Sequence, residues 1–146
     1  MESSEELRNL IAKHTVRYEI WRHVDIYDGR RVTDGFDLEL HGTHDHGHTQ
    51  LSPGCDLCRR TYGDLRKIAE TILPKEERLS IYEIPPFDSS LHTRAGGRLE
   101  VVLTICIRHR SEYFADVDQC EERCLQEMIG KLKDLGAADG RRSGHN

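Results

Sequence analysis

The chain has 146 residues, 36% of them hydrophobic and 32% charged, and its net charge is −5 with the histidines neutral. This length suits one domain with a real core, and the negative charge argues against a general nucleic-acid binder, which needs a basic face. No apolar run approaches the roughly 18–20 residues of a membrane span, and the acidic N-terminus does not resemble a secretion signal. We therefore expect a cytoplasmic protein with reduced cysteines and with neither a membrane nor a nucleic-acid partner.

The first half of the chain predicts a helix and then a hairpin. Ser3 or Ser4 can cap the helix, and an alternating strand begins at Thr15. The residues expected to face inward on this strand are Val16, Tyr18, Ile20, Val24 and Ile26, and those expected to face outward are Arg17, Glu19, Trp21, His23 and Asp25. Asp28-Gly29 and Asp34-Gly35 bracket a turn region. Phe36 to His41 then continues the alternation and predicts the second strand of the hairpin.

The rest of the chain predicts two helices and two more strands. A helix is expected to start at Ser52-Pro53, with an apolar stripe that ends before Pro74. A third strand around Leu79 to Tyr82 and a long hairpin connection over 87–97 follow. The fourth strand, 99–109, is apolar on both faces. It is expected to be central in the sheet, or to be covered on its second face by the first helix or by another subunit. A last helix, capped by Asp116 or Asp118, is expected to end at Gly136.

This order predicts an α+β fold with an N-terminal helix and a ββα-ββα pseudo-repeat. We expect a four-stranded antiparallel sheet with the helices packed on one face. The expected organisation is one domain over 1–135, with a metal-binding loop at 41–58, and a disordered tail over 136–146.

The loop, HGTHDHGHTQLSPGCDLC, carries the clearest chemistry of the chain. Imidazole and thiolate are the ligands that zinc and other borderline-soft metals take, and a Cys-x-x-Cys pair is a frequent zinc half-site. The predicted ligands are Cys55, Cys58 and two of His44, His46 and His48. His41, at the end of the second strand, is a weaker candidate, and Asp45 can orient a ligand imidazole.

The same loop is compatible with three further roles. It can be a flexible histidine-rich surface that binds metal adventitiously, a redox Cys-x-x-Cys pair, or a metal carrier. A site with four protein ligands would be closed and structural, whereas three ligands and a water would make it open and catalytic. We expect the closed form, because the loop offers more donors than one ion needs.

Several other residues are assigned by pattern. Cys106, Cys120 and Cys124 are expected to pack in the core, although Cys120 and Cys124 have a spacing that can hold metal. The remaining histidines and the outward residues of the first strand are expected at the surface, where some can form a ligand or dimer contact. These are His14, His92 and His109, and Arg17, Trp21 and His23 with Arg108 and Arg110.

The sequence thus predicts a small zinc-binding protein that acts as a binding or regulatory module and possesses a sheet face or edge strand suited to homodimerisation. The alternative is a metal-dependent, hydrolase-like enzyme with an open zinc site. The sequence does not identify a substrate or a catalytic residue.

Overall fold

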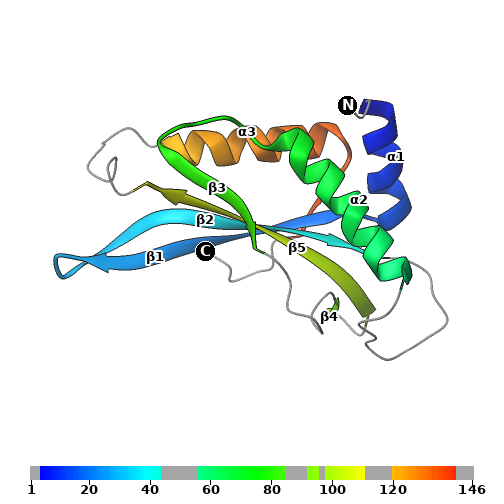
Figure 1. Cartoon of the computed structure of the whole chain (residues 1–146), viewed down its shortest axis with the longest axis horizontal. Coiled ribbons are helices and arrows are strands. Elements are labelled where there is room, and N and C mark those ends of the chain that lie inside the picture. The colour runs from blue at the N-terminus through cyan, green and yellow to red at the C-terminus, as the bar shows by residue number, and fades with distance from the viewer. Residues whose placement is uncertain (1–3, 44–55, 85–91, 96–97, 111–119, 141–146) are drawn as a thin grey trace.

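We describe a computed structural model of the chain, which places residues 4–43, 56–84, 92–95, 98–110 and 120–140. The fold is α+β, with three helices on one side of a mixed sheet (Figure 1). Its elements are, in chain order, α1 (Ser4–His14), β1 (Arg17–Tyr27), β2 (Arg30–Gly42), α2 (Asp56–Ile72), β3 (Leu79–Ile84), β4 (His92–Ala95), β5 (Arg98–His109), α3 (Cys120–Asp134) and β6 (Ala138–Asp139). No described helix is long and apolar enough to cross a membrane.

The sheet follows the order β3-β5-β2-β1-β6, and β4 also pairs with β5. The pairings among β1, β2, β3, β4 and β5 are antiparallel, whereas β6 runs parallel to β1. The predicted central position of 99–109 is confirmed, because β5 lies between β3 and β2. The sheet is therefore not the four-stranded antiparallel one that the pattern predicted.

The two additional strands account for this difference. Strand β4 lies within the segment that was predicted as a hairpin connection. The chain leaves α3 through Gly136, which has a φ of +98°, and β6 then lies along the edge of β1 inside the predicted tail. Both strands are short, and a strand of two to four residues has too few positions to show a periodic pattern.

The core lies between the helices and one face of the sheet. Its sheet side comes from alternate residues of the strands, with Leu38 paired to Ile105 and Leu40 to Leu103. The predicted apolar stripe of α2 is confirmed, since Leu65 and Ile68 are fully buried. Burial of such side chains stabilises the fold by about 1.5–3 kcal/mol each.

The far end of the β1–β2 hairpin departs from the predicted alternation. Val24 and Ile26 were expected to face inward, but they are exposed, because the hairpin extends beyond the helices that would cover them (Figure 1). Only Asp28-Gly29 forms the turn, with both residues at positive φ. Asp34 is instead the extra residue of a β-bulge, since His23 pairs with Gly35 and Val24 with Thr33.

Candidate functional site at the end of strand β2

The predicted zinc ligands lie mostly in a segment that cannot be compared with the structure. His44, His46, His48 and Cys55 are outside the described residues, as are Asp45 and the predicted helix start at Ser52-Pro53. Cys58 lies in the first turn of α2, where its side chain is fully buried and belongs to the hydrophobic core. Their role as ligands therefore stays a prediction.

The start of this segment is fixed to two helices by a histidine. His14, at the end of α1, has Nδ1 3.0 Å from the carbonyl oxygen of Thr43 and Nε2 2.8 Å from Oδ2 of Asp64 in α2. Thr43 in turn donates its backbone N–H and its hydroxyl to the carbonyl oxygen of His14. His14 was predicted at the surface, which is wrong: it is buried and links α1, α2 and the residue after β2.

The last residue of β2 packs directly against α2. A Cβ atom at Gly42 would lie 3.2 Å from Cδ2 of Leu65 and 3.3 Å from Cγ2 of Thr61. Glycine thus permits a close approach between the strand and the helix. Because Thr61 is only one turn beyond Cys58, the end of β2 and the first turns of α2, which flank the segment 44–55, lie near each other in space.

The opposite face of the same strand end holds a buried ionic network. It consists of two basic and three acidic side chains on three adjacent strands: Arg17, Glu19, Glu39, His41 and Glu100. Glu19, expected to be wet, is only 2% exposed, and His41 and Glu100 are also buried. The sequence missed this network, because its members become neighbours only when β1, β2 and β5 pair in register.

The network is organised around one arginine and one histidine. Arg17 donates from Nε and Nη2 to the two carboxylate oxygens of Glu100, at 3.1 and 2.6 Å, and from Nη1 to Glu19. Nε2 of His41 lies 2.9 Å from Oε1 of Glu39 and 3.5 Å from Oε2 of Glu19. Its Nδ1 lies 3.4 Å from Oε1 of Glu100. The bidentate hydrogen bonding of Arg17 with Glu100 is among the strongest types of pairing that proteins form.

Strand β6 closes one side of the network. The backbone N–H of Gly140 donates to the carbonyl oxygen of Tyr18 at 2.7 Å. A Cβ atom at Gly140 would lie only 2.6 Å from Nη1 of Arg17, so the chain passes closely beside the guanidinium group. The short parallel strand, which the sequence did not predict, therefore contributes to the burial of the charges.

The partners shift the protonation of the buried groups. Burial alone would raise the pKa of Glu100, but hydrogen bonds from His41 and Arg17 outweigh it and lower this pKa to about 2. Burial would lower the pKa of His41, but hydrogen bonds to Glu100 and Glu39 raise it above its ordinary value. The network thus favours the charged form of Glu100 and shifts the pKa of His41 toward the protonated form.

Two groups of described residues have donor atoms close enough to hold a metal ion. They are Glu19 with Glu39 and His41, and His109 with Cys120 and Glu121. In the first group, Arg17 already supplies a positive charge to Glu19 and would repel a cation. His41 is also on the opposite sheet face from the core residue Cys58, so these two side chains are separated by β2 and cannot share one ion.

Comparisons with known protein families, with curated proteins and with solved structures found no match.

Proposed function

We propose that this protein is a cytoplasmic zinc-binding module and that the segment between β2 and α2 holds the ion. The ligands in this proposal are Cys55, Cys58 and two of His44, His46 and His48. Zinc is the preferred metal because the donor set mixes nitrogen and sulfur.

The observation that carries the proposal is that the described residues on both sides of this segment are held in place. His14 fixes Thr43 to α1 and α2, and Gly42 packs against α2 one turn beyond Cys58. Folding has therefore already brought the two flanking elements together, so metal binding does not have to provide the entropic cost of closing the loop. A metal ion then needs only to gather donors between two flanking elements that already lie close together.

The test is the metal content of the protein purified without a tag and dialysed against a mild chelator. We expect one equivalent of zinc from this site, lost in Cys58→Ser and in a His44→Ala/His46→Ala/His48→Ala variant. Removal of a structural ion should also lower the melting temperature. X-ray absorption of the bound zinc should show a closed set of two sulfur and two nitrogen ligands.

The matched control is Cys106→Ser, which changes another buried cysteine outside both donor groups. Burial raises the pKa of the Cys106 thiol to about 11, and this thiol lies in neither group of converging donor atoms. This variant should lose some stability and keep its zinc. Equal zinc content in all these variants would exclude the loop as the site.

A second candidate is a metal-dependent, hydrolase-like enzyme, and the buried acid–base network on the same strand end favours it. His41 between Glu39 and Glu19 is an arrangement suited to proton transfer. In this case the zinc would retain a water ligand, and the absorption spectrum would show only three protein donors.

We also propose that the protein forms a homodimer through the sheet face that the helices leave open. Trp21 and Tyr82 lie in one row across this face, through Asp37 and Cys106, and are 41% and 47% exposed. Exposed aromatic residues on a sheet face are typical of interfaces.

A further inference from the structure

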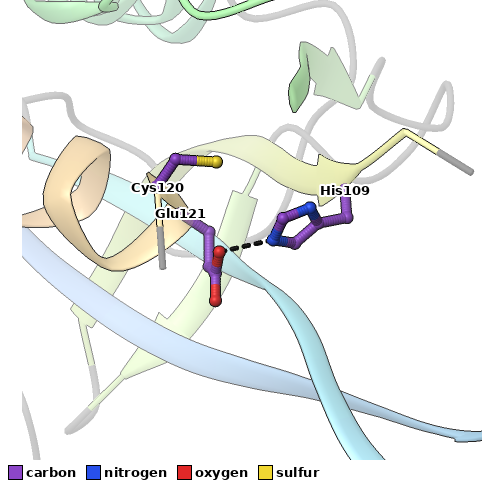
Figure 2. Close-up of side chains that lie close together, drawn as sticks. All are labelled: His109, Cys120 and Glu121. Atoms are coloured by element: carbon purple, nitrogen blue, oxygen red, sulfur yellow. Dashed lines mark hydrogen bonds and ion pairs between the residues drawn. The ribbon is translucent and has the colours of Figure 1, made fainter. Parts of the chain in front are cut away.

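The start of α3 and the end of β5 bring together a second group of metal-ligating side chains. Cys120 and Glu121 are the first two residues of α3, and His109 is the last residue of β5 (Figure 2). One donor atom from each of the three residues lies within 4.8 Å of the others. Figure 2 shows the Cys120 sulfur and the Glu121 carboxylate on the side of the helix start that faces the His109 ring.

The position of His109 corrects the surface location that the sequence predicted. His109 has the same strand parity as Ile105 and Ile107, so its ring is on the helix-covered side of the sheet. The start of α3 lies above it, and the His109 side chain is only 8% exposed. Three donors from segments that are separate in the fold thus meet inside the protein.

Among the described residues, the imidazole of His109 has a hydrogen-bond partner for one of its two nitrogens. Nε2 lies 2.5 Å from Oε2 of Glu121, whereas Nδ1 is buried and has no hydrogen-bond partner among the described residues. A buried polar atom without a partner costs about 1–3 kcal/mol. A neutral imidazole carries a proton on one nitrogen and a lone pair on the other, so one nitrogen of His109 can bind an ion.

We propose that His109, Cys120 and Glu121 form a site for a thiophilic divalent metal such as zinc, independent of the loop site. Donors on one zinc ion lie roughly 3.5 Å apart, so the present spread requires side-chain movements of only about 1 Å. A bound cation would not compete with a lysine or arginine for the Glu121 carboxylate, because no described lysine or arginine forms an ion pair with Glu121. Three protein ligands leave a fourth position open.

A metal fits this group better than a nucleophilic Cys–His–Glu triad. The side chain of Cys120 is fully buried, so a substrate cannot reach its sulfur without displacement of the helix start. A metal ion needs only the three donors to converge, and the N-terminus of α3 favours a negative thiolate.

The two proposed sites are far apart, so one ion cannot serve both. His41 pairs with Val102 near the loop, and His109 lies seven residues further along β5. At the rise of an antiparallel strand this corresponds to roughly 23 Å. Figure 1 shows the end of β2 and the start of α3 at opposite ends of the sheet.

The experiment is cobalt loading of the full chain in a Cys55→Ser/Cys58→Ser background, which removes the loop thiolates. We expect one equivalent of Co²⁺ and a thiolate-to-cobalt charge-transfer band. Cys120→Ser should abolish the band, and His109→Gln should weaken Co²⁺ binding at least tenfold. Cys124→Ser, one turn further along the same buried helix face, should leave the band unchanged.

Glu121→Gln provides a variant that keeps the side-chain shape if Cys120→Ser fails to fold. It should retain the thiolate band, shift the cobalt d–d absorption and lower the affinity, because a charged ligand becomes neutral. The proposal is overturned if the loop-variant background shows no thiolate band, or if the band survives Cys120→Ser. These outcomes do not depend on the loop site, whose failure would instead appear as an unchanged zinc content in the loop variants.

Discussion

The two faces of the sheet near the end of β2 are buried to similar depths but have opposite chemistry. On the covered face, Leu40 pairs with Leu103, and both are fully buried in the hydrophobic core. On the open face, Glu19, His41 and Glu100 are almost equally buried but carry charge. The covered face gains stability from apolar area, whereas the open face depends on each charge retaining its partner.

Because of this difference, removal of a single side chain should destabilise the fold more on the open face than on the covered face. A buried ion pair contributes little net stability compared with an apolar pair of the same shape, but removal of one partner is strongly destabilising. In some proteins such networks contribute conformational specificity, and this one lies at the end of β2, the strand that leads into the proposed metal loop. Its variants should therefore behave unlike variants of an exposed ion pair.

The largest effect is expected for Arg17→Ala. Loss of the guanidinium leaves Glu19 and Glu100 buried without their main cationic partner, which should reduce the free energy of unfolding by about 3–5 kcal/mol. Urea denaturation measures this loss. The matched variant is Arg66→Ala, which removes a bidentate arginine–glutamate pair with Glu83 at a more exposed position. It should cost only about 0–1 kcal/mol, and similar losses in both variants would show that the network is not effectively buried.

A smaller effect on the free energy of unfolding is expected when Glu100 is protonated at low pH. Its pKa is lowered in the folded protein, so its stabilising contribution is present above pH 4.5 and is lost as the pH falls toward about 2. The difference in unfolding free energy between the wild type and Glu100→Gln should therefore shrink across this window. His41 has the opposite sign: its raised pKa gives stability below pH 6.5 that is lost at higher pH. A pH-independent difference for Glu100→Gln would contradict the depressed pKa.

The smallest effect on stability is expected for Trp21→Ala. Trp21 is half-exposed on the open face, and surface substitutions usually change stability by no more than about 0.5 kcal/mol. The same substitution should weaken self-association if this face forms the dimer, which sedimentation velocity over a concentration series measures. Ile26→Ala, on the exposed end of the hairpin, is the control and should leave association unchanged. An association constant that is equal in both variants would remove the open face from the dimer proposal.

The sequence by itself determined those features that depend on one element at a time. Helical spacing identified the buried stripe of α2, and apolar residues on both parities identified β5 as central. The residue types between His41 and Cys58 also predicted metal chemistry without any knowledge of the fold. Periodicity reports which residues share a face, and residue type reports what that face can bind.

Only the tertiary structure decided which faces are covered and which distant residues meet. Arg17 and Glu100 are far apart in the chain, and they pair because β1 and β5 flank β2. His109 meets Cys120 and Glu121 because α3 starts above the end of β5, and His14 is buried because Thr43 and Asp64 both reach it. Burial depends on what packs against a residue from elsewhere in the chain, and the local pattern contains no information about that neighbour.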